Sequence, residues 1–187
     1  MARFIPTEQD KVNGLRAILY EIEQALESWI HTRNCDQTVK NALTESCLVK
    51  VRALVDFFEK SKRTKKDMLA EDFGFAAREI TGIDKDRLHR YVAHLTYERV
   101  QSPLPNGWPL DDLVPPVLMR SADLIRHLLT PGRGNIQDAA EQAWRNLLRA
   151  IERGLESPHP HQQLNHTDTT YSGRLYDSTG TIRWPVP

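Results

Sequence analysis

The chain has 187 residues, and its 25 Lys and Arg residues balance its 25 Asp and Glu residues, so the formal net charge at pH 7 is zero. This length is within the usual range of one domain and is sufficient to bury a sizeable apolar core. The balanced charge excludes an overall electrostatic attraction to nucleic acid or to an anionic membrane, so such binding has to come from a local patch.

Targeting signals and ligand-binding cysteine motifs are not apparent in the sequence. No stretch approaches the roughly 18 consecutive apolar residues that span a bilayer, and the start, MARFIPTEQDK, lacks the apolar core of a signal peptide. We therefore expect a cytoplasmic protein with no membrane partner. Cys35 and Cys47 lack a CxxC or other metal-ligand spacing, so we expect reduced thiols, with Cys47 in the core, and neither a metal site nor a cofactor.

Two long amphipathic helices are predicted in the first third of the chain. Residues from Thr7 to His31 begin with Thr-Glu-Gln-Asp, which is typical of a capped helix start, and apolar residues follow at helical spacing. Residues from Asp36 to Lys60 repeat this spacing and contain neither Gly nor Pro. The next residues, SKRTKKD, indicate a basic connection, and DMLAEDFGFAAREITG indicates short helical turns around a bend that contains glycine.

Three further helices are predicted after the basic connection. The first runs from about Asp84 to Gln101, because Asp84 is a suitable N-cap and the prolines that follow Gln101 prevent continuation. The second runs from Leu110 to Leu129, and the turn-rich TPGRGN separates it from the last helix at about Ile136 to Leu155.

Five principal helices joined by short connections predict an all-α fold. The expected architecture is an up-and-down helical bundle with an accessory helix, and nothing in the sequence indicates a βαβ unit. We expect residues 1–156 to form the bundle domain. Residues 157–187 contain many Pro, His, Ser and Thr, which favours a C-terminal tail that is extended or forms a small β-hairpin on the bundle.

The helix from about Asp84 carries the residues most suited to chemistry. At about 100° per residue, Arg87, Tyr91, His94 and Glu98 fall in one stripe beside the apolar seam. A guanidinium can bind two phosphate oxygens, and an imidazole can transfer a proton near neutral pH. Arg87 and His94 are therefore the catalytic candidates, with Tyr91 and Glu98 in support. The alternative is a structural stripe of hydrogen bonds and ion pairs that fixes this helix to its neighbour.

Two residues of the second helix can complete such a site. Arg52 and Asp56 are four positions apart near the apolar face, so either side chain can turn toward the third principal helix. The alternative for this pair is an ordinary surface ion pair.

A local basic patch is the candidate for phosphate binding. It combines Arg90 with four residues of the basic connection, namely Lys62, Arg63, Lys65 and Lys66. The alternative is a solvated loop, because no aromatic residue interrupts that run to provide a surface for base stacking.

The spacing Arg87-x6-His94, late in a helical bundle, resembles the Arg-x4-6-His signature of the HEPN superfamily, whose members include ribonuclease toxins and RNA-processing enzymes. The helix LTESCLVKVRALVDFF, which begins at Leu43, and the later VAHLTYER are similar to those of a group of uncharacterised bacterial HEPN-like proteins. The resemblance covers roughly residues 43–99. The family's commonest motif has a polar residue after the Arg and a His four residues later, whereas here Leu88 follows Arg87.

The resemblance implies a homodimer in which the motifs of two subunits meet in a cleft. It also implies metal-independent RNA cleavage, with His94 assisting proton transfer and Arg87 stabilising the charge on phosphorus. RNA and an antitoxin or other regulatory protein are the implied partners. Other HEPN-like domains lack catalysis, so the alternative function is a non-catalytic dimerisation or partner-binding module.

Overall fold

The fold consists of α-helices throughout the part of the chain that can be described. The structure, a computed structural model, describes residues 4–61, 67–93, 108–131 and 138–156. These ranges contain α1 (Glu8–His31), α2 (Gln37–Glu59), the short 3-10 helix η1 (Ala70–Phe73), α3 (Lys85–Ala93), α5 (Leu110–Leu128) and α6 (Asp138–Glu156). None of the described residues forms a β-strand, so the prediction of an all-α fold is confirmed. The β-hairpin considered for residues 157–187 falls outside these ranges.

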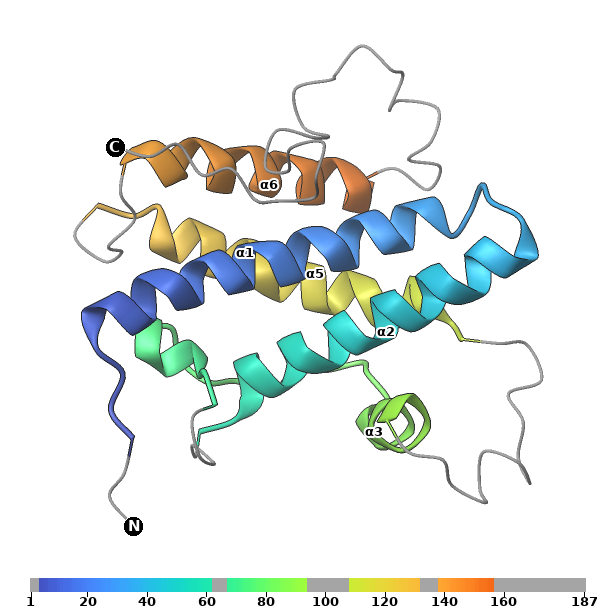
Figure 1. The fold of residues 1–187 in the computed structure, drawn as a ribbon, viewed down its shortest axis with the longest axis horizontal. Coiled ribbons are helices and arrows are strands. Elements are labelled where there is room, and N and C mark those ends of the chain that lie inside the picture. Colours follow the sequence, from blue (N-terminus) through green and yellow to red (C-terminus); the bar gives the residue numbers. More distant parts are fainter. Residues whose placement is uncertain (1–3, 62–66, 94–107, 132–137, 157–187) are drawn as a thin grey trace.

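Four of the helices lie side by side and the fifth crosses them. In Figure 1, α1, α2, α5 and α6 run across the view, whereas α3 is seen almost end-on beside α2. The neighbours α1 and α2 are antiparallel, as are α5 and α6. The up-and-down order therefore holds within each of these pairs, and α3 is the accessory helix. None of the described helices is long and apolar enough to cross a membrane.

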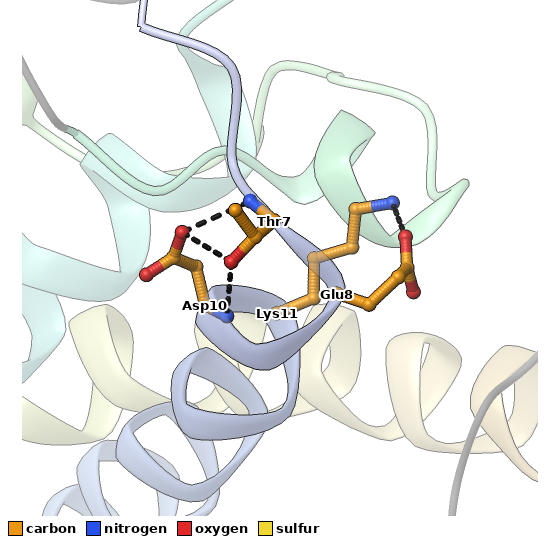
Figure 2. A network of polar contacts seen from close by, with 4 residues as sticks. All are labelled: Thr7, Glu8, Asp10 and Lys11. Carbon is orange, nitrogen blue, oxygen red and sulfur yellow. Dashed lines mark hydrogen bonds and ion pairs between the residues drawn. The ribbon is translucent and has the colours of Figure 1, made fainter.

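The start of α1 follows the Thr7 cap that the sequence predicts, and α2 begins after an Asp36 cap. The backbone N–H of Asp10 donates to Thr7 Oγ1 over 3.1 Å, and the N–H of Thr7 donates to Asp10 Oδ2 over 2.9 Å (Figure 2). The Asp36 carboxylate accepts from the backbone N–H groups of Thr38 and Val39 at the start of α2. These contacts satisfy N–H groups that a helix end would otherwise leave without a partner.

Removal of the α1 cap should destabilise the fold. We expect Thr7→Ala to lower the free energy of unfolding by about 1 kcal/mol, because the backbone N–H of Asp10 loses its acceptor. Urea denaturation measures this loss. Thr38→Ala is the matched control, since that side chain is exposed on α2, and an equal loss in the control would contradict a specific role for the cap.

All five α-helices contribute to one apolar core. Side chains with almost no exposed surface include Ile22 and Leu26 of α1, Val51 and Phe58 of α2, Leu88 of α3, Leu118 and Ile125 of α5, and Trp144 and Ile151 of α6. Cys47 is also in this core as a free thiol, as the sequence predicts, and burial raises its pKa to about 12. This core fixes the positions of α3 and α5, which carry the candidate site.

The segment between η1 and α3 is held on the bundle by an arginine of α5. Gly74 adopts a φ of 70°, which glycine reaches without strain, so it makes the bend that the sequence predicts. Arg120 donates to the carbonyl of Ala76 over 2.6 Å, and its guanidinium lies 4.1 Å from the ring centre of Phe75. These contacts lead the chain from the end of α2 back across the bundle to α3.

One acidic side chain of α1 is buried in the folded chain. Glu23 is 7% exposed. Desolvation by burial, with a smaller contribution from the charge of Glu27, raises the pKa of Glu23 to about 7. The folded protein therefore holds this proton more tightly than the unfolded chain does, and stability falls as the pH rises from about 4.5 to about 7.

Replacement of Glu23 should remove part of this pH dependence. We expect Glu23→Gln to raise the free energy of unfolding at pH 8 by about 1 to 3 kcal/mol, because the buried charge is lost, and to change it little at pH 4. Thermal denaturation at the two pH values measures the effect. Glu71→Gln, at an exposed position, serves as the control, and an equal effect of Glu23→Gln at both pH values would refute this origin.

Candidate functional site

Arg87 is held by an aromatic ring. The carboxylate of Asp84 accepts the backbone N–H of Arg87 over 2.9 Å, which confirms Asp84 as the cap of α3. The Arg87 side chain is half-buried, and its guanidinium carbon lies 5.6 Å from the ring centre of Trp108. Arg87 Nε is buried, and no hydrogen-bond acceptor for it lies among the described residues. The aromatic face thus anchors the guanidinium while a donor remains without an acceptor.

Trp108 also lines a groove on the molecule. This groove has a volume of about 990 Å³ and lies between the start of α2 and the start of α5. Its polar wall comes from α2, through Gln37, Lys40, Asn41 and Thr44, and its more apolar wall comes from Val92, Trp108 and Leu110. Arg87 is not among the described residues that line the groove, but Trp108 both lines the groove and contacts the Arg87 guanidinium.

The groove exists because the inward face of α2 is polar at the start of the helix and apolar from Leu48 onward. At about 100° per residue, Asn41 and Thr44 fall on the same side of α2 as Leu48, Val51 and Val55. The later residues are buried, whereas Asn41 is exposed and Thr44 is half-buried. Polar groups are costly to bury without partners, so this side of α2 packs into the core from Leu48 onward and borders an open groove before it.

A hydrogen-bonded corner closes one end of the groove. Asp111 Oδ1 accepts from the indole N–H of buried Trp29 over 2.8 Å and also from Arg33. The guanidinium of Arg33 lies 4.7 Å from the ring centre of Trp29. Burial acts to raise the pKa of Asp111, but the hydrogen bonds from Arg33 and Trp29 outweigh it, and the pKa lies below its ordinary value. The contact joins α1 to α5 beside the groove.

Loss of the Asp111 carboxylate should loosen this corner. We expect Asp111→Ala to lower the free energy of unfolding at pH 7 by about 1 kcal/mol, because the buried Trp29 N–H loses its acceptor. The difference should shrink as the pH falls through the lowered pKa of Asp111, because protonation removes the charge that pairs with Arg33. Denaturation followed by tryptophan fluorescence measures it. Asp112→Ala removes the neighbouring carboxylate and keeps the Trp29 contact, so an equal loss there would contradict this assignment.

Prolines leave backbone acceptors at the start of α5. Pro115 and Pro116 lie inside the helix and have no N–H group. The carbonyl oxygens of Asp111 and Asp112 therefore receive no hydrogen bond from the residue four positions later. Both aspartates line the groove, so α5 contributes two carboxylates to its wall.

The supporting residues predicted on α2 are positioned separately from Arg87. Asp56 turns toward α3, where its carboxylate lies 3.9 Å from His89 Nε2, and it also pairs with Lys60 over 3.1 Å. In the described part of the chain, Arg52 is half-buried on α2 and forms no ion pair with Asp56. The contact between His89 and Asp56 was not predicted, because the side of α3 that packs against α2 depends on the tertiary structure.

Most of the remaining predicted site residues lie outside the described ranges. Those outside the described residues are His94, Glu98, Lys62, Arg63, Lys65 and Lys66. Arg90 and Tyr91 belong to α3, but the description does not extend to their side chains. Trp29 and Trp144 are buried packing residues. Trp108 contacts Arg87 and lines the groove, so it belongs to the site.

Comparison with known proteins adds no relative. The chain matches no family model, no curated protein and no solved structure. The HEPN resemblance stays a prediction. Within the described ranges, no group of three or more His, Cys, Asp or Glu side chains is arranged to hold a metal ion.

Proposed function

We propose that this chain is a HEPN-like protein that binds RNA and cleaves it without a metal ion. The observation that supports the proposal is the environment of Arg87. Its guanidinium is half-buried against Trp108, and its Nε has no acceptor among the described residues. An arginine fixed in this way is suited to bind the oxygens of a phosphate.

Arg120 resembles Arg87 in that its Nε is also buried and has no acceptor among the described residues, but its guanidinium already donates to the carbonyl of Ala76. Three further arginines pair with carboxylates. Arg33 pairs with Asp111, Arg126 pairs with Asp123 and Glu152, and Arg145 pairs with Glu141. A carboxylate competes directly with a phosphate for the same N–H groups, whereas an aromatic face leaves the edge of the guanidinium accessible to an anion. Arg87 therefore has the more suitable environment for phosphate binding.

The proposed reaction assigns one role to each of two residues. The ribose 2′-oxygen attacks the adjacent phosphorus while His94 accepts the proton of the 2′-hydroxyl. The bond from phosphorus to the 5′-oxygen breaks, and that oxygen takes a proton, which leaves a 2′,3′-cyclic phosphate and a 5′-hydroxyl. Arg87 stabilises the negative charge that develops on the phosphate oxygens. A homodimer, a cytoplasmic location and a regulatory partner such as an antitoxin belong to the same proposal.

Substitution of the two residues tests this function. A labelled mixed RNA pool in EDTA is incubated with the unmodified chain, with His94→Ala and with Arg87→Ala. We expect cyclic-phosphate ends from the unmodified chain and a loss of rate of about a hundredfold or more in each variant. Arg87→Lys should be intermediate, because lysine keeps the charge but not the planar group that stacks on Trp108.

Arg145→Ala is the matched control, because it removes an α6 arginine that is already paired with Glu141. RNA affinity, measured by fluorescence anisotropy on the His94→Ala protein, separates binding from cleavage. If the products persist in His94→Ala, the proposed catalysis is wrong. If Arg87→Ala binds RNA as tightly as the unmodified chain, the binding role of Arg87 is wrong.

The second candidate function is a non-catalytic dimerisation or partner-binding module. It is favoured by the fact that the contact of Arg87 with Trp108 joins α3 to the residue pair that precedes α5, which is also a structural role. Under this function, Arg87→Ala lowers stability or dimer affinity and changes no RNA chemistry. Denaturation and sedimentation of the same variants distinguish the two functions.

A further inference from the structure

We infer that the groove beside Trp108 is a pocket for a nucleobase that carries an exocyclic amino group, as adenine, cytosine and guanine do and uracil does not. The inference rests on the proposed RNA-binding function and adds a base-binding subsite to it. It is argued from the shape, charge and hydrogen-bonding groups of the groove.

The groove has the size and the two unlike walls that a flat polar ring requires. Its volume of about 990 Å³ is at the upper end of the usual range for ligand pockets, so it can admit a base together with its ribose. Trp108 and Val92 present apolar surface on one side, and Asn41 and Thr44 present polar groups on the other. A base can stack on the indole while its edge forms hydrogen bonds with α2.

The charge of the groove favours a base over a phosphate. Arg33 and Asp111 neutralise each other in the ion pair at the corner. Among the described residues that line the groove, the other charged groups are Lys40, Glu45 and Asp112, so two carboxylates accompany one ammonium. This excess of negative charge disfavours a phosphate inside the groove. Neutral bases with N–H donors do not meet this repulsion.

The hydrogen-bonding groups of the groove are rich in acceptors. The carboxylates of Glu45 and Asp112 accept hydrogen bonds. Gln37 Nε2 donates to Asn41 Oδ1 over 2.7 Å, which leaves Gln37 Oε1 as an acceptor and Asn41 Nδ2 as a donor. A base edge with an amino donor beside a ring nitrogen acceptor complements this set.

The position of Trp108 connects the base pocket to the phosphate site. The indole lines the groove and carries the Arg87 guanidinium. Because the same ring contacts both, a nucleotide whose base stacks on Trp108 in the groove can bring its phosphate near Arg87. This arrangement separates base recognition by α2 from phosphate binding by α3.

Binding of mononucleotides tests the pocket. Calorimetry compares AMP, CMP, GMP and UMP with ribose 5-phosphate, which has no base, on the full chain. We expect at least one amino-bearing nucleotide to bind roughly 5-fold to 150-fold more tightly than UMP, and ribose 5-phosphate to bind more weakly than that nucleotide. Thr44→Val and Asn41→Leu should remove the preference, because they replace polar groups of the wall with apolar ones of similar size.

Thr38→Val is the matched control, since Thr38 is an exposed threonine of the same helix that does not line the groove. The pocket is supported if Thr44→Val and Asn41→Leu abolish the base preference and Thr38→Val retains it. Equal binding of ribose 5-phosphate overturns it, and so does a set of nucleotide affinities that the two groove variants leave unchanged. Under either of these outcomes, the polar residues at the start of α2 only face solvent and bind no base.

The two proposals fail in distinguishable ways. Oligomers of six adenosines and of six uridines are compared on the unmodified chain, Arg87→Ala and the groove variants. Binding that depends on Arg87 but not on base identity or on Thr44 leaves the proposed function in place and overturns the pocket. Binding of mononucleotides that depends on Thr44, without RNA binding or cleavage that depends on Arg87, supports the pocket and overturns the proposed function.

Discussion

The packing of α1 against α2, α5 and α6 is the contact on which the other helices depend for their positions. Ala25 and Leu26 on its inward side are almost completely buried. A Cβ atom at Gly154 of α6 would lie only 3.2 Å from Leu26 Cδ1, so glycine permits the close approach of these two helices. Because α1 touches three neighbours at once, it sets the separation of α2 from α5, and this separation contains the groove.

The groove is a consequence of where apolar residues stop along α2. Side chains such as Val51 and Val55 fill the space between the helices, whereas Asn41 and Thr44 on the same face border open space. Close packing in this region would bury amide and hydroxyl groups without guaranteed partners, which costs free energy. The bond between Trp29 and Asp111 closes the corner, and it satisfies the one polar atom of a buried indole. Core packing and the shape of the site therefore have the same origin.

The environment of Arg87 illustrates how a structural contact can serve a chemical role. The contact with Trp108 restrains the guanidinium, and among the described residues no carboxylate forms an ion pair with it, so the charge is available to a ligand. The same ring lines the groove, so the carboxylates of the groove and the Arg87 cation lie near one indole. This arrangement of charge is favourable for a ligand with a neutral polar part and an anionic part.

The described helices and several of their starts follow from local sequence signals. Apolar residues at helical spacing place α1 and α2, and the caps at Thr7 and Asp84 are local signals that act through the backbone of the same segment. The burial of Cys47 also followed from this periodicity.

Only the tertiary structure decided which side chains meet. Arg87 was selected by its spacing from His94, but its contact with Trp108 joins residues 21 positions apart, and the contact of Asp56 with His89 depends on the direction in which α3 crosses α2. Periodicity identifies the inward side of a helix, but it does not identify the helix against which that side packs. The groove required the relative positions of α2 and α5, which the joint packing of all the helices around α1 fixes.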